Sequence, residues 1–137
     1  MTAELGWLAA SALFTSVLWI PYVVNRIVEH GVWNALRNPN RDDRPTAAWA
    51  DRLMAAHANA VENLVVFAPL VLVAHAVGAT GPATAGAAAV YFFARVTHAV
   101  VYTAGIPVAR TLAFVAGFAA QAVFGVAILG AATHGAQ

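Results

Sequence analysis

The chain has 137 residues, of which 61% are hydrophobic and only 9% are charged. Soluble domains typically carry about 25% charged residues, so this composition excludes an ordinary soluble domain and indicates a protein that crosses a membrane several times. A net charge of +1, with no basic run, argues against nucleic acid as a partner. The absence of cysteine excludes disulfides and thiolate metal sites.

Four apolar segments follow one another along the chain, each long enough to cross a bilayer, which takes about 20 residues. A polar stretch, residues 25–50, follows the first segment, whereas short turns rich in glycine and proline join the other three. Short turns place consecutive helices side by side in opposite directions. The sequence therefore predicts a single all-α integral membrane domain over residues 1–137, an antiparallel bundle of four transmembrane helices with spans at about 5–24, 51–77, 83–103 and 107–133.

Arginines gather at one side of this predicted bundle. Arg110 follows the third turn, whereas the second turn, residues 78–82, carries no basic residue. By the positive-inside rule, the first loop and the third turn face the cytoplasm, with both termini outside. We expect a multi-pass protein of the cell inner membrane in this orientation. The other arginines of this side lie in or beside the first loop, at Arg26, Arg37, Arg41, Arg44 and Arg52.

Polar side chains interrupt the second and third spans at matching depths. At ~1.5 Å per residue, Glu62 lies level with Arg95, about 15 Å from the cytoplasmic side, and Asn59 lies level with His98. Ionisable groups at that depth usually have a partner, so the sequence predicts a Glu62–Arg95 ion pair. In one interpretation this ion pair has only a structural role: it fixes how the two helices pack, with Asn59 and His98 as hydrogen-bond partners. In the other, the carboxylate also binds the amine of a ligand.

A second polar group lies nearer the cytoplasmic side. Arg110 and Thr111 fall in the first turn of the fourth span, where free N–H groups and the helix dipole favour an anion. With Tyr102 beside them, a bound thiol can be held there as its thiolate, the nucleophilic form. The alternative for Arg110 is an ordinary interface arginine that contacts lipid phosphate. Tyr102 ends a helical stripe on the third span, made of Tyr91, Arg95, His98 and Tyr102.

Two further patterns concern structure. The other histidines show no metal-ligand spacing, so we expect no metal site. The fourth span carries small residues and one amide at four-residue steps, which is typical of a helix-packing face within or between subunits. These residues are Ala113, Gly117, Gln121 and Gly125.

Two stretches carry a family resemblance: DRLMAAHANAVEN, residues 51–63, and ARVTHAVVYTAGIPVARTLAF, residues 94–114. In these stretches the chain resembles the superfamily of membrane-associated proteins in eicosanoid and glutathione metabolism (MAPEG), in the AHAN form of bacterial members. The resemblance implies a homotrimer with sites between neighbouring subunits near the cytoplasmic face. It also implies that glutathione, or another low-molecular-weight thiol, is used on lipophilic substrates dissolved in membrane lipid.

The resemblance also assigns roles to individual residues. It implies that Arg110 and Tyr102 are catalytic, with Arg110 stabilising the thiolate. Ala55 stands where glutathione-using human members carry an arginine, and Ala58 stands where the prostaglandin synthase of the family carries another. The residues expected to bind the thiol are Arg26, Asn59, Glu62, His98 and Thr111.

We interpret the chain as a thiol-dependent transferase or peroxidase that acts on lipophilic electrophiles. A competing hypothesis is a non-catalytic membrane scaffold or lipid-binding protein that retains the polar core for assembly, which Ala55 and Ala58 favour. A third is a proton or solute path along the Glu62–Arg95 line, although a single line of paired groups does not make a continuous pore.

Overall fold

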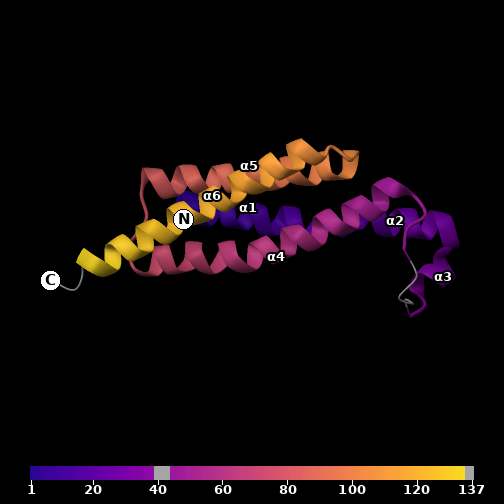
Figure 1. The fold of residues 1–137 in the computed structure, drawn as a ribbon. Helices are drawn as coiled ribbons and strands as arrows, with labels where there is room; N and C mark the ends of the chain where they lie inside the picture. Colours follow the sequence, from indigo (N-terminus) through magenta and orange to yellow (C-terminus); the bar gives the residue numbers. More distant parts are fainter. Residues whose placement is uncertain (39–43, 135–137) are drawn as a thin grey trace.

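The computed structural model describes residues 1–38 and 44–134. Within these residues every regular element is a helix, and four helical segments are long and apolar enough to cross a bilayer. Figure 1 shows these segments running side by side along one axis, with successive turns at alternate ends. The predicted all-α fold with four spans is confirmed. The helices are α1 (Ala3–Val17), α2 (Trp19–His30), α3 (Val32–Leu36), α4 (Ala48–Ala76), α5 (Pro82–Ala104) and α6 (Pro107–His134).

The first span is longer than the sequence predicted. Helices α1 and α2 together cover it and continue beyond residue 24, and α3 adds a short helix in the stretch that we expected to be a connector. The two halves of the span are separated at Leu18. Pro21 explains this break, because it has no N–H to donate to the Val17 carbonyl and its ring crowds that oxygen.

A carboxylate from α2 holds the chain where it enters α4. Glu29 Oε2 accepts the backbone N–H of Thr46 at 3.1 Å, and Glu29 Oε1 accepts that of Ala47 at 2.9 Å. Ala47 is the residue before the first turn of α4, and no side chain caps this turn. Glu29 therefore fixes the position at which the second span begins.

Three aromatic rings form the centre of the bundle. The Phe67 ring of α4 stacks on the Tyr91 ring of α5, with 3.6 Å between their centroids, and Phe124 of α6 meets Phe67 edge-on at 5.7 Å. All three side chains are buried. Because lipid tails are as apolar as these rings, close packing is what favours helix association here. Small side chains around the rings permit the close approach, at Ala87, Ala88 and Ala120.

The end of the bundle far from the arginines is fastened by a buried carboxylate. Glu4 of α1 is only 3% exposed, and it accepts a hydrogen bond from the Thr84 hydroxyl of α5 at 2.7 Å. Thr84 Oγ1 in turn accepts the backbone N–H of Gly81 at 2.8 Å. Because a buried carboxylate without a partner is costly, this contact ties the start of α1 to the start of α5.

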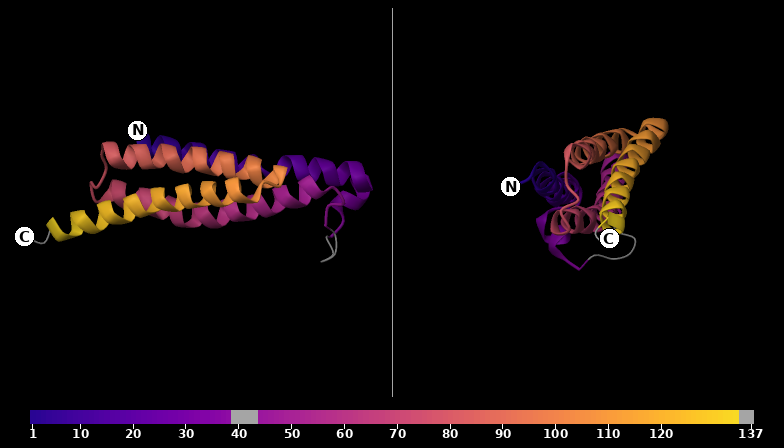
Figure 2. Two further views of the ribbon diagram at one scale, coloured as in Figure 1. Left: turned by 45° about the horizontal axis from the view of Figure 1, so that its top comes forward. Right: turned by 90° about the vertical axis from the view of Figure 1, so that its left-hand side faces the viewer.

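The small-residue face of α6 packs inside the subunit. Ala113, Gly117 and Gln121 are buried, and Gln121 Nε2 donates to the backbone carbonyl of Asn63 on α4 at 3.3 Å. The end-on view in Figure 2 shows α6 lying across α5 and α4. Of the two interpretations of this stripe, packing within a subunit is the one that these contacts support.

Candidate functional site

Arg95 lies at the junction of three helices and is almost completely buried, at 3% exposed. Its Nη1 donates to Asn59 Oδ1 of α4 at 3.2 Å, and its Nη2 donates to the Ala113 carbonyl of α6 at 3.2 Å. The guanidinium also lies 5.7 Å from the centroid of the Tyr91 ring and 5.6 Å from that of Phe114. Hydrogen bonds and aromatic faces thus surround this cation, which is how a buried guanidinium is stabilised in an apolar setting.

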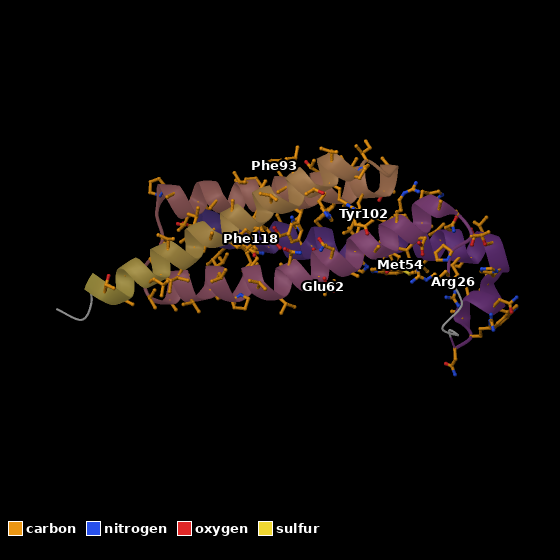
Figure 3. The ribbon with its side chains drawn as sticks, viewed as in Figure 1. Arg26, Met54, Glu62, Phe93, Tyr102 and Phe118 are labelled. Carbon is orange, nitrogen blue, oxygen red and sulfur yellow. The ribbon has the colours of Figure 1, made fainter. Side chains whose placement is uncertain are left out.

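The predicted Glu62–Arg95 ion pair is wrong for this subunit. Glu62 is exposed, and no ion pair involving it occurs among the described residues. The side chain that meets Arg95 is Asn59, which we expected level with His98. Glu62 follows Asn59 by three residues and is rotated about 60° from it around α4, away from the α5 contact. Figure 3 places Glu62 on α4.

Gly117 makes room for the Arg95 side chain. A Cβ atom added at Gly117 would lie 2.5 Å from Arg95 Nη2 and 3.0 Å from its Cζ. Real Cβ atoms do not approach other heavy atoms so closely, so Arg95 occupies the volume that a side chain at Gly117 would take. Gly117 and Asn59 together fix where the guanidinium lies.

A small polar hollow opens beside Arg95 toward the turn between α5 and α6. It has a volume of about 200 Å³, and we call it the polar hollow. His98 is buried in its wall, with its ring 5.4 Å from the Tyr102 ring and nearly perpendicular to it. The hollow is lined by Asn59, His98, Tyr102, Arg110, Thr111 and Phe114.

Arg110 is the cation of the polar hollow. Its Cζ lies 4.5 Å from the centroid of the Tyr102 ring, a cation–π contact. Within the described part of the chain, its guanidinium makes no hydrogen bond or ion pair with a protein acceptor. Arg110 belongs to the first turn of α6, which begins at Pro107, and Thr111 Oγ1 donates to the Pro107 carbonyl at 3.1 Å. The guanidinium N–H groups therefore remain available to an anion.

Five of the predicted site residues meet in this hollow: Asn59, His98, Tyr102, Arg110 and Thr111. Two others do not line it. Glu62 lies on the exposed side of α4, and Arg26 lines a separate hollow of about 90 Å³ between α2 and α4. In Figure 3, Arg26 lies toward α3, whereas Tyr102 lies toward the turn between α5 and α6.

Sequence reasoning missed one residue of this hollow and one contact beside it. Phe114 covers one side of the hollow. It lies four residues after Arg110 and three after Thr111, and this spacing, which places the three side chains on one helix face, could have identified it. The contact is that of Arg52, a residue expected at this end of the bundle: its Nε donates to the Thr103 carbonyl at 2.8 Å and so joins α4 to the end of α5. No sequence pattern identifies this carbonyl as its acceptor.

The sequence model of the MAPEG family matches residues 5–130, which include the residues of the polar hollow and nearly all of the four spans. No curated protein and no solved structure matches the chain.

Proposed function

This chain belongs to the MAPEG family, and we propose that it is a thiol-dependent transferase or peroxidase that acts on lipophilic electrophiles. The observation that supports this proposal most is Arg110, a guanidinium without a protein acceptor in the described residues that lies over the Tyr102 ring inside a polar hollow. A thiolate is the group that such a cation stabilises, and a thiolate is the nucleophile that the chemistry needs.

The proposed chemistry follows from this placement. Arg110 stabilises the sulfur anion, and the proton of the thiol leaves to solvent. In a transfer, the thiolate attacks an electrophilic carbon, a C–S bond forms, and the electron pair of the broken bond departs with the leaving group. Positioning and charge stabilisation supply most of the rate. Tyr102 holds the guanidinium through its ring face, and Thr111 places a hydroxyl beside the same site.

The thiol we propose is glutathione or another low-molecular-weight thiol. Asn59 and His98 line the inner part of the hollow and are the groups that orient it. Asn59 is itself held by Arg95 at 3.2 Å, so its amide has a defined direction. A hydrogen bond between a fixed amide and a peptide group favours one orientation of the thiol over others.

We further propose that the protein works as a homotrimer. Glu62 supports this, because an exposed carboxylate in the middle of a membrane span is expensive unless another surface covers it. A neighbouring subunit can supply that cover, and the site then lies between subunits. In such an assembly Glu62 and Arg26 of one subunit complete the polar hollow of the next, with Glu62 near the amino group of the thiol.

The proposed orientation places the arginine-bearing end, with the first loop and the turn between α5 and α6, in the cytoplasm of the cell inner membrane. The thiol then enters from water, and the lipophilic substrate enters sideways from membrane lipid. Exposed apolar side chains on α6, such as Val108 and Leu112, are suited to this lipid contact.

The second candidate is a non-catalytic, lipid-binding scaffold. It is favoured by Ala55 and Ala58, which are exposed on α4 and offer no cation to an anionic peptide. It is also favoured by an apolar groove of about 620 Å³ between α1, α4 and α5, large enough for part of an acyl chain.

Calorimetry on the purified protein in lipid nanodiscs separates the two candidates, with glutathione and cysteine as ligands. We expect wild type to bind at least one thiol, and Arg110→Ala to weaken that binding about tenfold or more, as removal of a charge-assisted contact does. Val108→Ala, in the same turn of α6 but exposed, is the control and should leave binding unchanged. Failure of every thiol to bind at millimolar concentration would sink the enzyme proposal.

A further inference from the structure

A second hollow lies next to the polar hollow, on the other side of Tyr102 and Arg110. Its volume is about 270 Å³, and we call it the Arg52 hollow because Arg52 lines it but not the polar hollow. It opens at the turn between α5 and α6. Its lining residues are Arg52, Tyr102, Gly105, Ile106, Pro107 and Arg110.

Arg52 is held in place by backbone. Its Nε donates to the Thr103 carbonyl at 2.8 Å, close to the C-terminal end of α5, where the helix dipole favours a cation. Its guanidinium packs against the turn, since a Cβ atom at Gly105 would lie 3.4 Å from Arg52 Cζ. The Nε edge of the guanidinium is therefore occupied by a structural hydrogen bond. Its other N–H groups make no contact with an acceptor in the described residues, and they remain available to a ligand.

The charge on the Arg52 hollow has no counter-charge in the described part of the chain. Arg52 and Arg110 both line it, and neither forms an ion pair there. None of the described carboxylates that could offset this charge lines the hollow. Asp51 lies 3.4 Å from Arg44, Glu29 binds the backbone before α4, and Glu62 is exposed on α4 and lines neither hollow. Two cations on one small hollow repel each other, and this repulsion is offset when an anion lies between them.

We propose that the Arg52 hollow is an oxyanion-binding site, in which a carboxylate or phosphate group lies between Arg52 and Arg110. A guanidinium offers a planar pair of donors that matches the oxygens of these groups. The partial positive charge at the start of α6 adds to the attraction. The inference goes beyond the thiol chemistry and does not depend on it, because the two arginines are positioned whether or not a thiol enters the polar hollow.

The oxyanion has two sources that share this chemistry. One is the acidic part of a water-soluble ligand, and the other is the phosphate of an anionic lipid headgroup at the membrane surface. The choice of bilayer distinguishes the two sources. In a zwitterionic bilayer only soluble anions can bind the hollow, whereas in an anionic bilayer soluble anions and anionic headgroups can both bind it.

The test uses the full chain in nanodiscs. In zwitterionic phosphatidylcholine, titration with inorganic pyrophosphate measures the soluble arm by calorimetry. With phosphatidylglycerol added, native mass spectrometry measures how many anionic lipids remain bound. We expect Arg52→Ala to weaken pyrophosphate binding, anionic-lipid retention, or both, by about tenfold or more. Loss in the first assay identifies a soluble ligand, and loss only in the second identifies a lipid.

Arg44→Ala is the matched control, because Arg44 is an exposed arginine near the same end of the bundle whose charge Asp51 already offsets. It should leave both assays unchanged. Arg52→Gln keeps a donor for the Thr103 carbonyl but removes the charge, and it decides the question if Arg52→Ala does not fold. The proposal is overturned if the folded Arg52 variant matches wild type and Arg44→Ala in both assays. Because neither assay involves a thiol, failure of the proposed enzyme activity leaves this result readable.

Discussion

Arg95 shows how a single buried cation can organise a membrane bundle. Its partners in the described residues are an amide from α4, two carbonyls from α6 and two aromatic faces, with no carboxylate among them. The missing side chain at Gly117 provides its volume. Because Arg95 also holds Asn59, the geometry of the polar hollow depends on a residue that does not line it.

Gly117→Ala should therefore disturb the site as well as the fold. The added methyl must displace the Arg95 guanidinium, and such overpacking costs about 1–3 kcal/mol, although alanine is the better helix former by about 1 kcal/mol. We expect a lower midpoint of thermal unfolding and weaker thiol binding.

The matched control for this change is Gly125→Ala, on the same helix, where an added Cβ meets no atom within 4 Å. It should leave the stability unchanged or raise it slightly. Equal effects of the two substitutions on the unfolding midpoint would show that Arg95 does not need the space at Gly117.

At the scale of the helices, the arginine-bearing end is built from contacts between elements far apart in sequence. Glu29 of α2 holds the residues before α4, and the Tyr22 hydroxyl of α2 lies 2.9 Å from His57 Nδ1 of α4. These contacts, with the bond from Arg52 to Thr103, set how α4 lies against its neighbours. The start of the second span is thus positioned by side chains from the first.

Glu29→Ala should loosen the start of α4 without unfolding the bundle. The N–H groups of Thr46 and Ala47 lose their acceptor, so we expect faster hydrogen exchange there by mass spectrometry. Glu29→Gln keeps one acceptor oxygen and should lie between wild type and the alanine variant. Val28→Ala, exposed on the same helix, is the control. Unchanged exchange at residues 46 and 47 in Glu29→Ala would contradict this role.

The helices were largely predictable because the length of each apolar segment and the glycine and proline turns define them. The site was only partly predictable. Counting depth from Asp51 put Asn59 level with His98, but α4 begins at Ala48, and Asn59 meets Arg95 instead. Depth along an axis also says nothing about rotation around it, and rotation is what takes Glu62 out of the contact. The sequence nevertheless predicted most residues of the polar hollow. Residues spaced by three or four along one helix share a face, and this remains true when the helix is displaced along its neighbour.

At the scale of the whole molecule, the outer surface of the bundle carries a carboxylate within a helix long and apolar enough to span a membrane. Apolar side chains cover most of its outer surface, as expected in lipid, but Glu62 interrupts this surface on α4. The proposed homotrimer accounts for this residue, and a lipid-facing monomer does not.

Glu62→Ala should therefore separate assembly from folding. We expect native mass spectrometry in a mild detergent to show fewer trimers than for wild type. The helical content by circular dichroism should be unchanged, because Glu62 is exposed and takes no part in the aromatic core of the subunit. Val65→Ala, which removes an exposed apolar side chain from the same helix, is the control. A trimer fraction equal to that of wild type would argue against Glu62 at the subunit interface.

The break at Leu18 divides the first span into two helices, α1 and α2. The first half, α1, is joined to α5 by the hydrogen bond between Thr84 and Glu4. The second half, α2, carries Arg26 and contacts α4 through the Tyr22 hydroxyl and His57. The two halves of the first span are thus held by different neighbours, α5 before the break and α4 after it.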